Sequence, residues 1–141
     1  MNVRRFALIL GIVYIVAGIA GFIPPLLTTP AADAPRLAVH SFQGNLLGLF
    51  PVNILHSLFH LVIGIWGLVA AKRLGAAVTY ARSVAIIYGV LTVMGLIPNL
   101  NTIFGLLPLH GNDIWLHAIT ALVSAYFGFA VKPETETQRA V

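Results

Sequence analysis

The chain has 141 residues, of which 59% are hydrophobic and only 9% are charged, and its mean hydropathy is +0.95. A typical soluble domain carries about 25% charged residues, so this composition excludes a water-soluble globule, a disordered tail and a nucleic-acid-binding protein. The length allows one compact domain. The sequence therefore predicts an integral membrane protein whose first partner is the lipid bilayer.

The net charge of +4 does not indicate an anionic partner, because the basic residues form small groups beside apolar runs rather than one patch. Such groups are typical of the ends of transmembrane helices. The chain contains no cysteine, which excludes disulfides and thiolate metal sites.

Four apolar segments follow one another along the chain. A bilayer core about 30 Å thick requires roughly 20 residues of helix. The predicted helices cover residues 6–27, 53–71, 83–97 and 114–131. The last two are short, so we expect them to tilt or to lie in a thin region of bilayer. The predicted fold is an all-α membrane protein, with a four-helix bundle in residues 1–132 and a polar cytoplasmic tail at 133–141.

The distribution of lysine and arginine predicts the orientation of these helices. With the N-terminus inside, Arg36 is the one basic residue on the outer side. The cytoplasmic side then holds the other seven, which are Arg4, Arg5, Lys72, Arg73, Arg82, Lys132 and Arg139. Because positive residues concentrate on the cytoplasmic side, both termini are predicted to lie inside.

The two halves of the chain look like copies of one helical hairpin. The motif Gly21-Phe22-Ile23-Pro24 at the end of the first helix recurs as Gly95-Leu96-Ile97-Pro98 at the end of the third. The pair Leu55-His56 on the second helix recurs as Leu116-His117 on the fourth. We expect a tandem repeat related by an axis along the membrane normal, which puts His56 and His117 at the same depth.

Each predicted helix has one stripe of small and polar residues, and the other faces are apolar. In lipid, small residues pack inward because they let helix backbones approach closely. Tyr14 and Tyr88 lie in the stripes of the first and third helices. The glycines predicted to mediate helix packing are Gly11, Gly18, Gly21, Gly64, Gly67, Gly95 and Gly128.

Three histidines are predicted to converge near the outer surface. His56 and His60 share one helix face because they are four residues apart, and His117 comes from the fourth helix at matched depth. Three neutral imidazoles can bind zinc, copper or another borderline metal. Asp113 stands one turn before His117, where it can orient that ring. Further hydrogen-bond partners for the cluster are Asn53, Tyr14 and Tyr88.

Other uses of these histidines stay open. His56 and His117 can act as paired axial ligands of a haem, or one histidine can hold the magnesium of a chlorophyll. The three rings can also serve only as hydrogen-bonding groups between helices. The chain has no Ser-His-Asp order, nucleophile elbow, P-loop or dinucleotide fingerprint, so it is not predicted to be an enzyme.

Two motifs carry a resemblance to a known family. The segment from Val52 to Gly64 has the pattern V-N-x-x-H-x-x-x-H-x-x-x-G, and Asp113 to His117 has the pattern D-x-W-L-H. Together with the glycine-rich first helix, they resemble a bacterial membrane family known only as domain-of-unknown-function family 4383. The resemblance implies a four-helix protein of the bacterial inner membrane, or of a thylakoid membrane in a cyanobacterium, and it implies no activity.

The sequence leaves two functions open. One is a structural or accessory subunit, packed in a larger membrane complex or a homo-oligomer. The other is a metal-, haem- or chlorophyll-binding membrane protein with His56, His60 and His117 as ligands.

Overall fold

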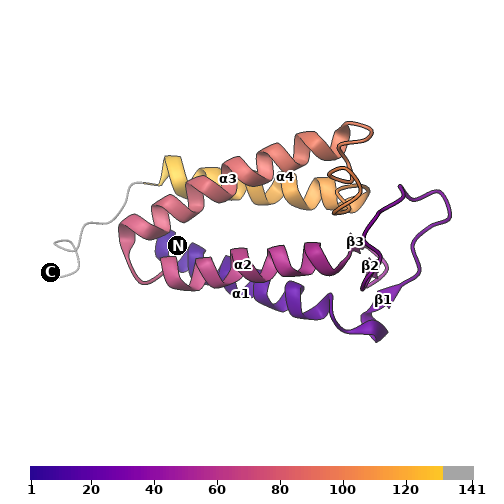
Figure 1. Cartoon of the computed structure of the whole chain (residues 1–141). Helices are drawn as coiled ribbons and strands as arrows, with labels where there is room; N and C mark the ends of the chain where they lie inside the picture. Colours follow the sequence, from indigo (N-terminus) through magenta and orange to yellow (C-terminus); the bar gives the residue numbers. More distant parts are fainter. Residues whose placement is uncertain (132–141) are drawn as a thin grey trace, which may run out of the picture.

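The computed structural model describes residues 1–131, which are mostly helical (Figure 1). The predicted tail at 133–141 lies outside the described residues. The helices are α1 (Val3–Ala20), α2 (Ile54–Ala70), α3 (Leu74–Leu96) and α4 (Asn112–Ala125), and a π-helical turn (Tyr126–Ala130) prolongs α4. By length and composition, α1, α3 and the prolonged α4 can each cross a membrane, whereas α2 is a shorter apolar helix of 17 residues. These features indicate a membrane protein.

The helices pack as two antiparallel hairpins, α1 with α2 and α3 with α4 (Figure 1). The apolar core between the hairpins includes Phe6, Tyr80 and Val84. Phe6 stacks on Phe127 with ring centroids 4.6 Å apart, and Trp66 meets Tyr80 edge-on. Aromatic contacts between α1 and the turn after α4 therefore hold the two hairpins together at the end where the N-terminus lies.

Glycines allow the helices within each hairpin to approach closely. A Cβ atom on Gly11 would lie 2.8 Å from the carbonyl oxygen of Gly64, and one on Gly64 would lie 2.8 Å from that of Gly11. In the other hairpin, a Cβ atom on Gly128 would lie 2.9 Å from the backbone nitrogen of Arg82. Only a residue without a side chain fits at such separations. The other predicted packing glycines, Gly18, Gly21, Gly67 and Gly95, also lie against neighbouring segments.

The first helix ends earlier than predicted, at Ala20 instead of residue 27. Pro24 and Pro25 form a separate 3₁₀ turn (Pro24–Leu26), and Ile23 before them is extended. A residue that precedes proline is disfavoured in the helical conformation. The apolar run therefore continues beyond the point where the backbone can remain helical.

The third helix begins at Leu74 instead of residue 83, so the loop before it shrinks to residues 71–73. The added turns present Ala77, Tyr80 and Ala81 to the core, where none of them is exposed. Arg82 lies within this longer helix, and its Nε donates a hydrogen bond to the carbonyl of Gly128 at 2.8 Å. This contact accommodates a charged residue within the helix.

A small antiparallel sheet corrects the all-α prediction. It joins β1 (Leu27–Thr28), β2 (Gly44–Leu46) and β3 (Phe50–Val52) in that order, between α1 and α2. The turn after β2 uses Leu47 and Gly48 with positive φ values of 53° and 75°. The sheet segment also contacts residues 97–111, because the amide of Ala38 donates to the carbonyl of Gly105 at 2.7 Å. The segment between α1 and α2 and the segment at residues 97–111 together cover one end of the helices (Figure 1). We name them the outer segments, after the side of the membrane on which the sequence predicts them to lie.

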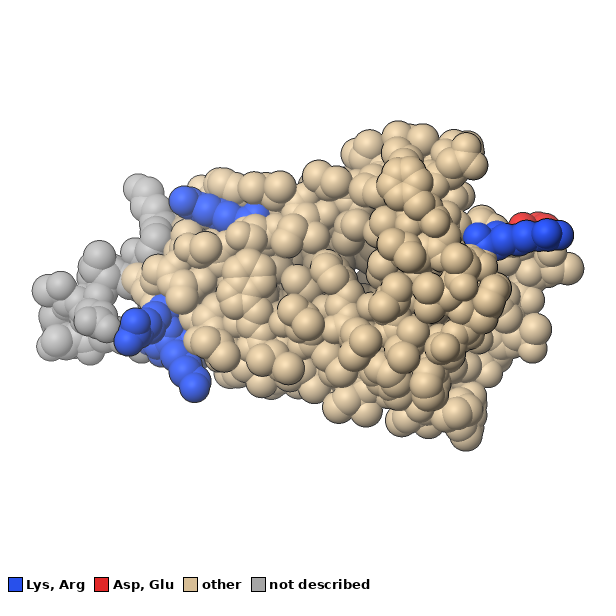
Figure 2. Space-filling view, in the orientation of Figure 1, with Lys and Arg blue, Asp and Glu red and all other residues tan. Residues whose placement is uncertain are grey.

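Basic side chains gather at the opposite end, beside the N-terminus (Figure 2). At this end Arg4 donates from Nε to the carbonyl of Ala71 at 2.9 Å, so it closes the α1–α2 hairpin. The end formed by the outer segments shows a basic side chain next to an acidic one (Figure 2). On this face, the charged side chains of the described residues therefore lie at the two ends of an apolar surface (Figure 2).

Candidate metal centre

Three buried histidines meet between α2 and α4, just beneath the outer segments. His56 and His60 lie one turn apart on α2, with their Nε2 atoms 3.2 Å apart. The ring of His117 on α4 has its centroid 6.0 Å from that of His56. One nitrogen from each ring lies within 4.8 Å of the others, and no ring is more than 6% exposed. The structure thus brings together the three histidines that the sequence singled out.

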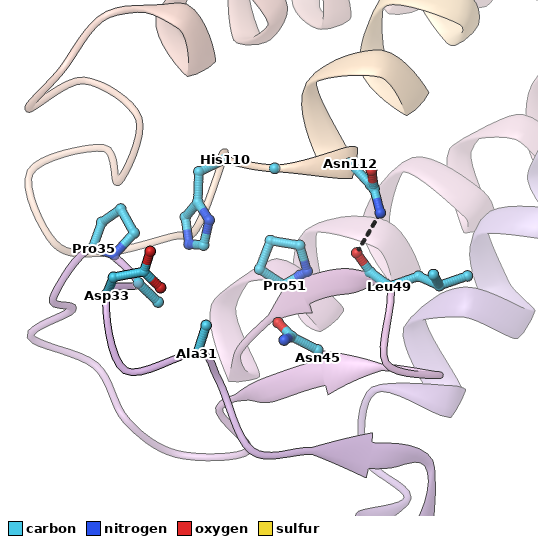
Figure 3. Close-up of a pocket in the computed structure, with 10 residues that line it drawn as sticks. Ala31, Asp33, Pro35, Asn45, Leu49, Pro51, His110 and Asn112 are labelled. Carbon is cyan, nitrogen blue, oxygen red and sulfur yellow. Dashed lines mark hydrogen bonds between the residues drawn. The ribbon is translucent and has the colours of Figure 1, made fainter.

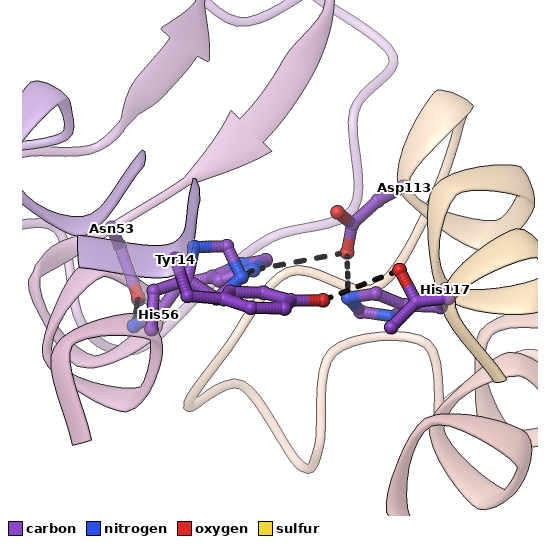
Figure 4. Close-up of polar contacts among 7 residues, drawn as sticks. Tyr14, Asn53, His56, Asp113 and His117 are labelled. Atoms are coloured by element: carbon purple, nitrogen blue, oxygen red, sulfur yellow. Dashed lines mark hydrogen bonds and ion pairs between the residues drawn. The ribbon is translucent and has the colours of Figure 1, made fainter. Parts of the chain in front are cut away.

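Asp113 faces this cluster from the first turn of α4. Its Oδ2 lies 3.4 Å from Nε2 of His117 and 4.0 Å from Nε2 of His56 (Figure 4). The residue is 1% exposed, and Oδ2 accepts no hydrogen bond from the described residues. A carboxylate is favoured at the N-terminus of a helix. The start of α4 therefore directs one carboxylate oxygen towards two imidazole rings.

Two tyrosines border the cluster. The ring of Tyr14 lies 4.9 Å from that of His60, and its hydroxyl donates to Oγ1 of Thr120 at 3.3 Å. The ring of Tyr88 lies 4.9 Å from that of His117, edge to face. The tyrosine rings contact each other with centroids 5.3 Å apart. Both tyrosines also belong to the apolar core, so they connect the histidines to it.

Asn53 lies beside the cluster, and its hydrogen bonds go to the backbone. Its Oδ1 accepts from the amide of His56 at 3.0 Å, which caps α2. Its Nδ2 donates to the carbonyls of Val39 at 3.1 Å and Leu106 at 2.7 Å. One buried side chain thus fixes the first turn of α2 and joins it to both outer segments.

Two of the separations between donor atoms are close to those around one metal ion. Tetrahedral ligands about 2.0–2.1 Å from zinc lie about 3.3 Å from one another. The His56–His60 separation of 3.2 Å and the His117–Asp113 separation of 3.4 Å agree with that value, and the His56–Asp113 separation of 4.0 Å is slightly longer. The nitrogens of all three histidines lie within 4.8 Å of one another, so the rings would move closer together around a tetrahedral ion.

A small apolar cavity adjoins the histidines. Its volume is about 110 Å³, and His56 and His117 form part of its wall. The remaining wall consists of aliphatic and aromatic side chains from α2, α3 and residues 97–111. The sequence did not predict this cavity, because its apolar residues are indistinguishable from those that face lipid.

A second, more open pocket lies between the two outer segments and the start of α4 (Figure 3). It has a volume of about 310 Å³ and is lined by Asp33, Asn45, His110 and Asn112 among others. Burial lowers the pKa of His110 from its usual value. His40 is exposed, and its Nδ1 lies at hydrogen-bond distance, 2.8 Å, from Oε1 of Gln43. Neither His40 nor His110 belongs to the buried group.

Comparison with known proteins identifies the family. The family model named Domain of unknown function (DUF4383) matches residues 4–130, a segment that includes the histidines, Asp113 and nearly all of the four helices. No curated protein and no solved structure matches the chain. Because the match covers most of the chain, this protein belongs to the DUF4383 family.

Proposed function

We propose that this protein binds one transition-metal ion within the membrane, through His56, His60 and His117. Asp113 lies beside the ion, as a fourth ligand or as the group that orients the His117 ring. The observation that carries the proposal is the convergence of three buried imidazoles, each offering a nitrogen within 4.8 Å of the other two.

The unpartnered carboxylate oxygen of Asp113 favours an ion over simple helix packing. Its Oδ2, which faces Nε2 of His56 and of His117, is buried without a hydrogen-bond partner among the described residues. Buried polar groups are normally satisfied, and each unsatisfied one costs about 1–3 kcal/mol. A buried carboxylate also requires a positive partner, and the groups at ion-pair distance from Asp113 are these two rings. A bound cation supplies that charge.

The spacing also favours an ion over a macrocycle. Nε2 of His56 and Nε2 of His60 are in direct contact, and the adjoining cavity measures about 110 Å³. Pockets for larger organic ligands span about 300–1,000 Å³. A haem or chlorophyll ring between these histidines would require the helices to separate. Imidazole with carboxylate suits zinc, copper and iron, and these are the metals we expect.

Metal content tests the proposal directly. The full chain is purified in mild detergent, titrated with Zn²⁺ and with Cu²⁺, and measured by mass spectrometry of bound metal. We expect one equivalent per chain, and at least tenfold weaker binding in His60→Gln and His117→Gln, since each substitution removes a ligand. His40→Gln, which changes an exposed histidine, is the matched control and retains full binding.

A structural or accessory subunit, with the histidines as hydrogen-bonding groups between helices, predicts the opposite result. In that case wild type, His60→Gln and His117→Gln bind equally little metal, and chelator does not change the thermal stability of the wild type. This outcome would overturn the metal proposal.

We further propose that the four helices form a bundle of two tandem hairpin repeats. Gly67 packs on Ala7 in one hairpin, and Gly128 packs on Ala81 in the other. The offset of 74 residues that relates Gly21 to Gly95 also relates Ala7 to Ala81, and the offset of 61 that relates His56 to His117 also relates Gly67 to Gly128. The proposed orientation has both termini in the cytoplasm, in a bacterial plasma membrane or a thylakoid membrane, and is supported by the basic residues beside the N-terminus.

A further inference from the structure

We propose that the apolar cavity beside His56 and His117 admits a small uncharged diatomic molecule, of the class of dioxygen or carbon monoxide, as an additional ligand of the bound ion. This inference rests on the proposed metal centre and names what that centre binds.

The cavity is adjacent to the proposed ion because two of its ligands form part of the cavity wall. His60 and Asp113 do not line the cavity, so a molecule in the cavity would reach an ion held by all four groups past the rings of His56 and His117. The cavity wall contains no donor side chain other than the two histidines. A molecule in the cavity can therefore form a directional bond only with these rings or with the ion.

The size and polarity of the cavity define its occupant. A volume of about 110 Å³ lies below that of an engineered apolar cavity of about 150 Å³ that stays dry and binds benzene or xenon. An anion or a polar substrate would lose its hydration in such a site without replacement hydrogen bonds. A molecule of two or three atoms without charge enters at little cost.

The position of the cavity also suits a ligand that arrives through the bilayer. Its wall includes Phe59 on α2, Leu91 on α3 and Leu107 in the outer segment, all of which are only partly buried. Diatomic gases are more soluble in hydrocarbon than in water. The cavity therefore lies near the apolar surface of the helices, and we expect the ligand to arrive from the lipid side.

Carbon monoxide on the copper(I)-loaded chain tests the inference. The probe is the infrared C–O stretch of metal-bound carbon monoxide, recorded without oxygen on protein in detergent, together with the copper content. We expect one bound carbon monoxide per copper in the wild type. Leu91→Phe and Leu107→Phe fill the cavity from two different elements, and we expect at least tenfold weaker carbon monoxide binding with unchanged copper content. Leu96→Phe, on an exposed face of the same helix, is the matched control and binds as the wild type does.

The outcomes separate the two proposals. If copper binds but carbon monoxide does not, or binds equally in both cavity-filled variants, the inference is overturned and the metal centre stands. If no metal binds to the wild type, the metal centre fails and the inference falls with it.

Discussion

Asp113 is the residue with the most unusual surroundings. It is an almost completely buried acid whose ion-pair neighbours are two histidines. In a membrane segment an ionisable residue indicates function, and its partner identifies the site. Here the partners are two of the proposed ligands, His56 and His117. Asp113 therefore contributes negative charge to the proposed site and lies where it can orient the two rings.

The substitution Asp113→Asn keeps the shape of the side chain and removes its charge. We expect the affinity for Zn²⁺ to fall by about 10–100-fold, the range found when groups that support metal ligands are changed. The measurement is a competition titration against a chelator of known affinity. Asp33→Asn, which changes an exposed carboxylate in the outer pocket, is the control. Equal affinities in all three proteins would show that Asp113 does not serve the ion.

Part of the candidate site could be predicted residue by residue from the sequence. The four-residue spacing of His56 and His60 placed both on one helix face, and the repeat placed His117 at their depth. The backbone contacts of Asn53 were not predictable, because Val39 and Leu106 are distant in the chain and approach it only through the fold. Hydrogen bonds to carbonyl groups leave no pattern in the sequence.

Among the elements, the α1–α2 hairpin depends most on its glycines. Gly11→Ala places a methyl group against the backbone of α2, and such overpacking costs about 1–3 kcal/mol. Gly89→Ala on α3 meets nothing within 4 Å and should stabilise by about 0.5–1 kcal/mol through helix propensity. The measurement is reversible unfolding of the metal-free chain in detergent. A loss of stability in both variants, or in neither, would contradict the packing described for α1 and α2.

The helices were predictable as elements, but two of their boundaries were not. Hydropathy extended the first helix through Pro24 because leucine and isoleucine continue on either side of it. It started the third helix too late because Thr79 and Arg82 lower the local hydropathy, although the residues between them pack in the core. Apolar composition indicates which segments can lie in lipid. The residues at which a helix begins and ends depend instead on backbone geometry and tertiary contacts.

At the scale of the whole molecule, the orientation in the membrane is the prediction to test. The chain has no cysteine, so single cysteines can be introduced without background. Ala32→Cys lies in the outer segment and Ala76→Cys lies near the start of α3, both at exposed positions. We expect an impermeant thiol reagent to label Ala32→Cys in intact cells and Ala76→Cys only after permeabilisation. The reverse pattern would show that the helices are inverted.

Composition predicted the membrane protein but not its outer sheet. The strands are two or three residues long, too short for an alternating pattern to stand out. They are held by a turn with positive φ angles and by contacts with residues 97–111. Tertiary contacts rather than local preference explain this part of the fold.

The hydrogen bonds of Asn53 have a kinetic consequence for the proposed centre. Both outer segments are fastened to the first turn of α2, the same turn that carries His56. A hydrated ion that reaches or leaves the histidines from the outer side must wait for these segments to separate. The lifetime of the bound ion then depends on how often the hydrogen bonds of Asn53 to the two outer segments break. A centre of ordinary affinity can therefore still exchange its metal slowly.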